Sequence, residues 1–504
     1  MKKFLIKIAI AAVFFSSIVI MDGCKKSKLD LLPGGPTEID FFTKEADFNQ
    51  AVLGVYAKMT DFFWYNGGQF STPMPVFLLP GDDITTNNTS EEFEHFGPIN
   101  PGSGRLGYLY SRHYQLINRA NTLLSKINGP ESSVYKTPNL QNYHKGEAHF
   151  LRGYALYNLW NLFGTAPFDT VRVTSSDQFF PGGTTGTQLL DQAIQDFTVA
   201  ATLLPQTWNS ANLGRVTMNS ANGMLGKSLV FRASATKNAA DYTAAIAAFN
   251  KITGANLTPV FGDNFAFDTE NNEEALFEFQ ASQAQGGDNV WLDNDFDNPI
   301  GSLSVYWGYY DNNYSLFNVS RFYVTEKVAT TFEAGDPRIT STFDPADRTV
   351  RKYVERNQNN QPGAASVNNY RILRYADVLL LKAEALLQSG GSTTEAISLI
   401  NQVRGRARAM ANSGVPADRA VGESDRIKIM DWIIAERLIE LAGEGQRWFD
   451  LRRWQLQGII NLNNAFFSSN TAANMSFQLP KHLNFAIPNS ETDINPNVIQ
   501  NPGY

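Results

Sequence analysis

The stretch that decides the fold is ERLIELAGEGQRWFDLRRW, residues 436–454. Carboxylates and arginines are interleaved within it, and apolar residues lie between them. These carboxylates could carry out acid–base chemistry, or they could form ion pairs that hold a scaffold together. A carboxylate matched by arginines stays ionised, whereas a proton donor needs a raised pKa. The pattern therefore favours structural ion pairs for Glu436, Arg437, Glu440, Glu444, Arg447, Asp450 and Arg452.

Helical periodicity surrounds this stretch. Apolar residues recur every three or four positions from 373 to 387 and from 396 to 407, and Gly390-Gly391 lies between the two patterns. This arrangement predicts a helical hairpin of the tetratricopeptide type, although the strict repeat consensus is absent. The same spacing occurs in 48–62, 110–127, 148–162, 190–204, 221–229, 242–252 and 427–441. We therefore expect a mainly α-helical protein whose apolar faces bury against one another.

Residues 255–370 differ from the rest. The stretch Glu274–Gln280 alternates like a short strand, and the residues after it are rich in Asp, Asn, Gly and aromatic side chains. We expect an irregular, loop-rich insertion with small sheets. It divides the chain into an N-terminal helical region (43–254) with a long early loop, the insertion (255–370), and C-terminal helical hairpins with a wrapping tail (371–504).

The N-terminus has the features of a lipoprotein signal peptide, residues 1–23. Lys2 and Lys3 precede an apolar run, 8–20, that is short for a membrane span. Cys24, the only cysteine in the chain, follows this run as in a bacterial lipobox. We expect Cys24 to become the acylated N-terminus and 24–42 to form a tether. The alternative is an ordinary signal peptide with an incidental cysteine.

Composition and isolated motifs exclude several classes of protein. Lys plus Arg number 42 against 49 for Asp plus Glu, so the net charge of −7 argues against a nucleic-acid binder. The spacing G-x-G-x-x-G at 102–107 follows no predicted strand and indicates a loop rather than a dinucleotide site. Gly226-Lys227-Ser228 lies in a helical pattern and is no phosphate loop. His144 and His149 point to different sides of a helix, which makes a zinc site improbable.

A calcium site is a weak possibility. Asp293, Asp295 and Asp297 occupy positions one, three and five of a calcium-loop pattern. The sixth position is Asn298 rather than glycine, and the twelfth is Ser304 rather than glutamate. A solvated acidic loop is therefore the preferred interpretation, and we expect no other cofactor.

Aromatic residues are concentrated between Tyr306 and Tyr323. Neither a helical nor a strand period places all of them in a core, so some are expected at the surface. Exposed rings offer flat apolar faces for sugar C–H groups, and nearby Asp and Asn side chains can bond sugar hydroxyls. Trp291, and Phe93 and Phe96 of the early loop, could join this surface. The alternative is that the rings form the core of the lobe.

Several motifs together resemble the SusD/RagB family, the surface glycan-binding lipoproteins of Bacteroidetes-type bacteria. The resemblance covers nearly the whole chain, and the C-terminal tail carries its most specific part. The residues that carry it are Gly146–Tyr154, Leu162–Pro167, Gly214–Thr217, Asn272–Glu274, Ile487-Pro488, Glu491, Asn495-Pro496 and Gln500–Tyr504.

This resemblance implies a SusD-like fold of about four tetratricopeptide-like helix pairs packed against an irregular lobe. It also implies a nutrient-uptake lipoprotein of the outer membrane, facing the cell exterior and partnered with a TonB-dependent SusC-like barrel. The ligand would be an oligosaccharide bound on the irregular lobe, and no catalysis would be involved. Mapped onto this chain, the carbohydrate-binding residues would be Asp82, Asp83, Trp291, Trp307, Tyr309 and Tyr310.

Two other functions stay open from the sequence. The protein could bind peptides or serve only as a structural lid on the transporter. A hydrolase would need two exposed, unpaired carboxylates at the spacing used by glycosidases.

Overall fold

The computed structural model describes residues 41–63, 74–87, 91–281, 305–306, 322–354, 365–366, 368–411, 414–470 and 475–504. The predicted signal peptide and nearly all of the tether, Cys24 included, lie outside these residues.

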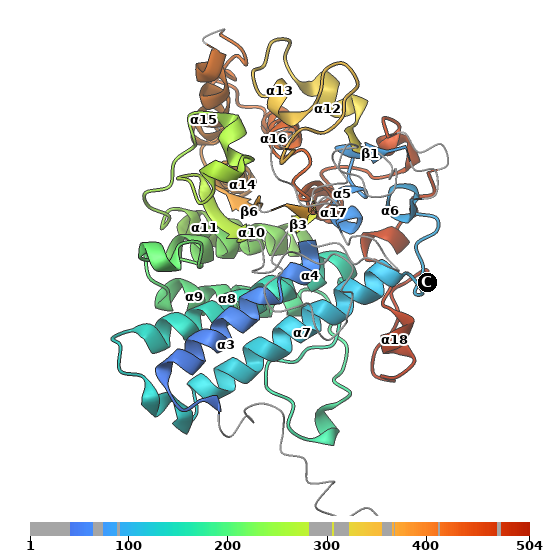
Figure 1. Cartoon of the computed structure of the whole chain (residues 1–504). Coiled ribbons are helices and arrows are strands. Elements are labelled where there is room, and N and C mark those ends of the chain that lie inside the picture. Colours follow the sequence, from blue (N-terminus) through green and yellow to red (C-terminus); the bar gives the residue numbers. More distant parts are fainter. Residues whose placement is uncertain are drawn as a thin grey trace, which may run out of the picture.

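Antiparallel helices form the scaffold (Figure 1). From α7 to α11 each helix packs on the next, and α11 then packs on α14, which contacts α15 and α16. The N-terminal α3 and α4 lie against α7. The long helices are α3 (Glu45–Ala57), α7 (Gly104–Ile127), α8 (Leu140–Phe163), α9 (Gln188–Leu203), α10 (Met218–Thr236), α11 (Ala239–Phe249), α14 (Tyr375–Gln388), α15 (Thr393–Ala411), α16 (Arg426–Glu440) and α17 (Arg447–Gln457). Shorter ones are α4 (Thr60–Phe63), α5 (Pro75–Leu78), α6 (Glu92–His95), α12 (Glu326–Thr331), α13 (Ile339–Thr342) and α18 (Asn489–Thr492).

Two glycines show how the sequence shapes this packing. Gly390 has a φ of 79°, a left-handed conformation that lets the chain turn from α14 into α15, as the hairpin prediction required. Gly226 lies inside α10, and a Cβ there would be 2.4 Å from Cε1 of Phe249 on α11. The two helices can therefore approach closely only because position 226 has no side chain. The neighbouring Lys227 forms an ion pair with Asp377, so this stretch is structural, as predicted.

The sequence-based boundaries needed two corrections. The glycine-rich stretch 102–107, predicted to be a loop, runs into the first turn of α7, which begins at Gly104. Residues 447–457 form the complete helix α17, whereas no helix was predicted after 441. Arginines and an aspartate occur on every side of α17, so its sequence has no clear apolar stripe. All of its residues from Arg447 to Trp454 are nevertheless buried.

Short strands tie the insertion to the scaffold. The described residues form three sheets of two antiparallel strands each, and every one of these sheets joins segments that are distant in sequence. The predicted strand near 274–280 is confirmed as β2, which pairs with the strand that leads into α14. The pairs are β1 (Ile84–Thr86) with β4 (Phe322–Val324), β2 (Ala275–Phe279) with β6 (Tyr370–Arg374), and β3 (Val305–Tyr306) with β5 (Ala365–Ser366).

The charged residues of 436–454 are buried, and the prediction of structural ion pairs is confirmed for six of the seven. Arg437 bonds Asp377 and Asp450, each at 2.7 Å. Arg452 is the exception, since its guanidinium donates to the carbonyl of Leu483 and to Oδ1 of Asn484. It thereby holds the C-terminal tail against α17.

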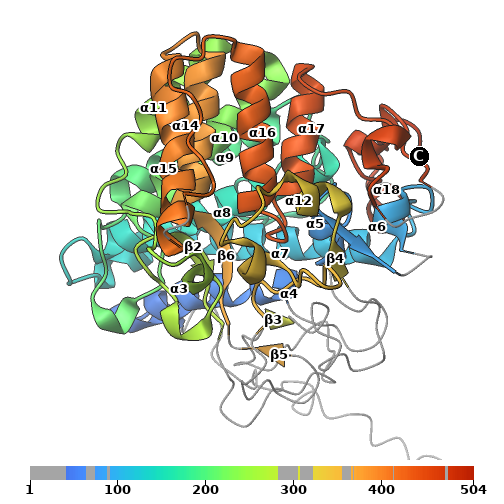
Figure 2. The same ribbon diagram turned by 90° about the horizontal axis from the view of Figure 1, so that it is seen from above.

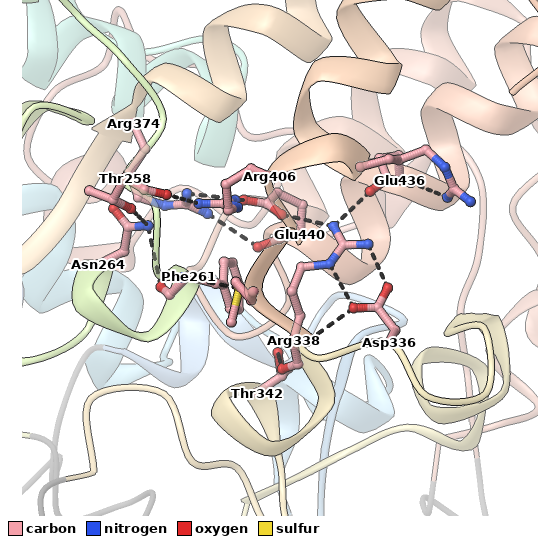
Figure 3. A network of polar contacts seen from close by, with 12 residues as sticks. Thr258, Phe261, Asn264, Asp336, Arg338, Thr342, Arg374, Arg406, Glu436 and Glu440 are labelled. Atoms are coloured by element: carbon pink, nitrogen blue, oxygen red, sulfur yellow. Dashed lines mark hydrogen bonds and ion pairs between the residues drawn. The ribbon is translucent and has the colours of Figure 1, made fainter. Parts of the chain in front are cut away.

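Glu440 is the centre of the largest network (Figure 3). Its carboxylate lies 2.5 Å from Nη2 of Arg406, 2.9 Å from Nη1 of Arg338 and 3.2 Å from Nη1 of Arg374. These arginines come from α15, from the start of α13 and from the end of β6. Arg374 also pairs with Glu444, at 2.8 Å. One carboxylate thus joins the insertion to two parts of the C-terminal region.

Electrostatics keep Glu440 ionised. Burial alone would raise the pKa of its carboxyl, but the three arginines lower this pKa to about 2. The network therefore stabilises the folded protein above the ordinary glutamate pKa. This stabilisation is lost as the pH falls toward 2, because the carboxylate is then protonated.

Glu440→Ala is expected to lower the free energy of unfolding by about 3–5 kcal/mol, because the three arginines lose a buried partner charge. Urea unfolding followed by circular dichroism would measure this. Asp418→Ala is the matched control, since Asp418 pairs with Arg408 at the exposed surface and its loss should change little. Equal effects of the two substitutions would contradict the central role of Glu440.

Candidate functional site

The early loop and the insertion meet at one edge of the molecule. β1 of the early loop pairs with β4 at the end of the insertion, and Ile84 is opposite Val324. The resemblance predicted that a binding site would combine these two segments, and their backbones are indeed adjacent. Figure 2 shows β3, β4 and β5 at this edge, away from α14, α15 and α16.

Asp82 precedes β1 and is completely buried. Its carboxylate accepts hydrogen bonds from Nε of Arg447, at 2.5 Å, and from Nζ of Lys327, at 2.6 Å. Burial would raise the pKa of this carboxyl, but the two cations outweigh burial and lower it to about 2. Asp82 therefore carries a fixed negative charge that joins the early loop to α17 and α12.

Asp83 is also buried, with 1% of its surface exposed, but it has no cation partner of its own. The amide of Gly443 donates to Oδ2 at 3.0 Å, while Oδ1 has no hydrogen-bond partner. Burial and the neighbouring charge of Asp82 raise the pKa of Asp83 to about 7. The two adjacent aspartates thus differ in charge over the acidic range.

Neither aspartate is accessible to a ligand in this structure, which differs from the binding role that we predicted for Asp82 and Asp83. Both attach the early loop to the C-terminal region instead. Of the two alternatives for Phe93 and Phe96, surface or core, the structure confirms the core, since both rings are buried. Phe93 contacts Phe485, and Phe96 lies among aromatic rings that include Trp448.

The sequence contains a signal that could have corrected the predicted binding role of the two aspartates. Asp82 and Asp83 are flanked by the apolar residues Leu78-Leu79 and by Ile84, all of which are buried. A short acidic stretch between apolar neighbours is compatible with buried, paired carboxylates as well as with an exposed loop. Its partners, Arg447 and Lys327, could not be identified from such local information.

The predicted aromatic site lies outside the described residues. Trp291, Trp307, Tyr309 and Tyr310 belong to it, and so do the calcium candidates Asp293, Asp295 and Asp297; these assignments stay predictions. The described framework nevertheless surrounds this segment in sequence. β2 ends at Phe279 and β4 begins at Phe322, and β3 at 305–306 directly precedes Trp307.

The two histidines of α8 that were considered for a zinc site have other partners. Nδ1 of His144 lies 2.9 Å from the hydroxyl of Tyr135, and Nδ1 of His149 lies 2.7 Å from Asp196. The described ranges contain no group of three or more His, Cys, Asp or Glu side chains that could hold a metal ion. Within the same ranges, no helix combines the length and apolar character needed to cross a membrane.

A partly open pocket of about 20 Å³ lies between α8, α10, β6 and α17. Tyr157, Asn158 and Lys227 are among the residues that line it. This volume has room for a water molecule but not for a sugar ring. The hydroxyl of Tyr157 and the amide nitrogen of Asn158 have no protein partner, so they are suitable ligands for such a water.

The fold and the site define a class of helical-repeat scaffold that carries an irregular lobe. The family model described as "SusD family" matches residues 272–504. The model described as "Starch-binding associating with outer membrane", a SusD-like family, matches residues 36–229. The chain belongs to the SusD/RagB family.

Similar proteins support this assignment over the length of the chain. A SusD-like protein of Formosa agariphila, P2, is 28% identical, and the alignment covers 92% of this chain and 94% of the relative. A SusD superfamily protein from Bacteroides vulgatus matches with a TM-score of 0.71 and 23% identity, over 92% and 100% of the two chains. Surface glycan-binding protein A from Bacteroides uniformis matches with a TM-score of 0.67 and 20% identity, over 91% and 99%.

Asp83→Asn tests the electrostatics of this edge. The folded protein holds one more proton than the unfolded chain between pH 4 and 7, so the stability due to Asp83 falls as the pH rises through this range. The asparagine still accepts from Gly443 and does not titrate. At pH 8 the variant should be more stable than wild type by about 2–4 kcal/mol, with a much smaller difference at pH 5.

Urea unfolding at the two pH values would measure this difference. Asp82→Asn is the matched control and should destabilise at both, because Arg447 and Lys327 lose their partner charge. If Asp83→Asn changed the free energy of unfolding equally at pH 5 and pH 8, the inference that the pKa of Asp83 is raised in the folded protein would be wrong.

Proposed function

We propose that this protein binds an oligosaccharide on its irregular lobe and delivers it to a TonB-dependent barrel of the outer membrane. Cys24 would anchor the protein there by lipid, with its body on the exterior face. The observation that carries this proposal is family membership along the chain. The two family models match 36–229 and 272–504, and one of them is described by starch binding and association with the outer membrane. A structural neighbour is named as a surface glycan-binding protein.

The proposed binding residues are the aromatic side chains of the insertion: Trp291, Trp307, Tyr309 and Tyr310. Their rings would stack on sugar faces, while nearby Asp and Asn side chains bond hydroxyls. By analogy with base stacking, each ring contributes about 1 kcal/mol. A few such contacts give micromolar to millimolar affinity, which suits a protein that must also release its ligand to a transporter.

The described framework is well suited to carry such a site. β4 and β6 are held by pairing with β1 and β2. The pair of Asp82 with Arg447 attaches the early loop to α17, and the pair of Arg374 with Glu440 attaches β6 to α16. Binding residues on loops work best when a rigid scaffold positions the ends of those loops. This geometry supports a binding function for the segment between β2 and β4.

A hydrolytic function has less support. The carboxylates of 436–454 are buried and paired with arginines, so they do not offer the accessible acid and base that a glycosidase needs. We therefore propose binding without catalysis. An assay for release of reducing sugars, run with the glycan that binds best, would detect an enzymatic activity.

Replacement of Trp307 and Tyr309 together by alanine is expected to weaken glycan binding about 30-fold, because two stacking contacts of about 1 kcal/mol each are removed. Isothermal titration against a panel of plant, host and microbial glycans would first identify the ligand and then measure the loss. Trp432→Ala is a matched control, because Trp432 lies on α16 between Arg419 and Lys428 and is not one of the proposed binding residues.

Unchanged affinity in the double variant would refute this site. If no glycan of the panel bound while the barrel still co-purified with the protein, a structural lid or a peptide-binding role would replace the proposed function. Co-purification from membranes thus tests the proposed barrel partner independently of the proposed glycan ligand.

A further inference from the structure

Exposed apolar side chains are concentrated in two segments. The described residues contain twelve large apolar side chains that are exposed, and six of them lie in the α8–α9 connection and in the last eleven residues of the chain, 494–504. Isolated exposed residues need no explanation, but a local concentration indicates a contact surface. We call these six residues the apolar patch: Phe168, Val171, Phe179, Phe180, Ile494 and Ile499.

Hydrogen bonds hold the two segments of the patch together. Nδ2 of Asn497 donates to the carbonyl of Phe180 at 2.8 Å, and Nδ2 of Asn495 donates to that of Pro181 at 3.0 Å. The amide of Gly183 donates back to the carbonyl of Asn497 at 3.2 Å. Ile494 and Ile499 therefore flank a part of the tail that is fixed beside Phe179 and Phe180.

The α8–α9 connection is in turn attached to the scaffold. Nδ2 of Asn121 on α7 donates to the carbonyls of Asp169 and Val171, at 3.2 and 3.1 Å. Nη1 of Arg152 on α8 donates to the carbonyl of Thr170 at 2.8 Å. The loop that carries Phe168 and Val171 is therefore held by the scaffold while these side chains are exposed.

The N-terminal end of the described chain lies against the same part of α7. The ring of Phe42 packs on Phe48 and lies 5.9 Å from Nζ of Lys126. Lys126 and Asn121 are five positions apart on one helix, which corresponds to about 7.5 Å along its axis. In Figure 1 the start of α3 and the α8–α9 connection both lie at the lower end of the molecule.

We propose that the apolar patch inserts into the interface of the lipid bilayer and orients the protein on the membrane. This inference rests on the lipid anchor at Cys24, which is part of the proposed function. About 17 residues separate Cys24 from Phe41, so the tether holds the end of α7 within roughly 60 Å of the membrane.

The nearby anchor favours lipid as the occupant of the patch. The loops that carry the patch also expose the acidic side chains of Asp177 and Asp493. Apolar side chains on a body that is already held near a bilayer bury themselves at the boundary of headgroups and acyl chains. The adjacent Thr174, Ser175 and Ser176 are exposed and can bond headgroups.

A single cysteine variant tests the contact. Cys24 is the only cysteine and carries the lipid, so Phe179→Cys provides the only free thiol for an environment-sensitive fluorophore. The full lipoprotein is incorporated, at low protein-to-lipid ratio, into vesicles of phosphatidylethanolamine and phosphatidylglycerol. We expect a blue shift of the label and loss of most of its emission when the acyl chains carry bromine. Ile499→Cys should behave in the same way.

Val421→Cys is the matched control, since Val421 is also exposed and lies in the connection between α15 and α16. Its label should stay in water and keep its emission. The proposal is wrong if the label at 179 behaves like the label at 421 in protein that floats with the vesicles. If the label at position 179 were shielded from water only in membranes that contain the barrel, the patch would contact protein, and the proposed contact with lipid would be wrong.

Protein that does not float with the vesicles would disprove the anchor and, with it, the membrane contact. Glycan binding is measured separately by calorimetry on the same preparation. The three proposals, the membrane contact of the patch, the lipid anchor and the glycan site, can therefore each be refuted by a different result.

Discussion

The buried carboxylate of Glu440 is the constraint on which the rest of the structure depends. It accepts contacts from Arg338, Arg374 and Arg406, which belong to segments that are separated by tens of residues. Arginines of this kind are tolerated in an interior only when carboxylates match them in good geometry. The helices and the insertion are therefore coupled through Glu440, because its three cations come from separate segments.

The same logic extends to the edge where the early loop meets the insertion. Asp82 is paired with Arg447 at the start of α17, and Asp83 accepts from Gly443 in the connection before that helix. These contacts fix the early loop, and the pairing of β1 with β4 fixes the end of the insertion. A rigid scaffold thus surrounds, in sequence, the aromatic segment to which we assign ligand binding. Rigidity in the frame and variation in the loops suit a family that binds different ligands.

Much of the helical architecture could be predicted, and the exceptions share a cause. The periodicity of apolar residues identified α7 to α11 and α14 to α16, because each of these helices buries a large part of its apolar surface. It missed α17, whose arginines and aspartate are buried by partners in other elements. The family resemblance placed Asp82 and Asp83 at a binding surface, and the early loop made Phe93 and Phe96 candidates for the same surface. Their burial depends on Arg447, Lys327 and the C-terminal aromatic residues.

The sequence by itself determined the helical class, the structural nature of 436–454 and the family. All three follow from local patterns: periodicity, composition and short motifs. Only the tertiary structure decided which charges neutralise one another and which loops are buried. The physical reason is that a buried ion pair joins residues regardless of their separation, and Asp82 and Arg447 are 365 positions apart. No local pattern contains that information, whereas the folded chain brings both residues to the same place.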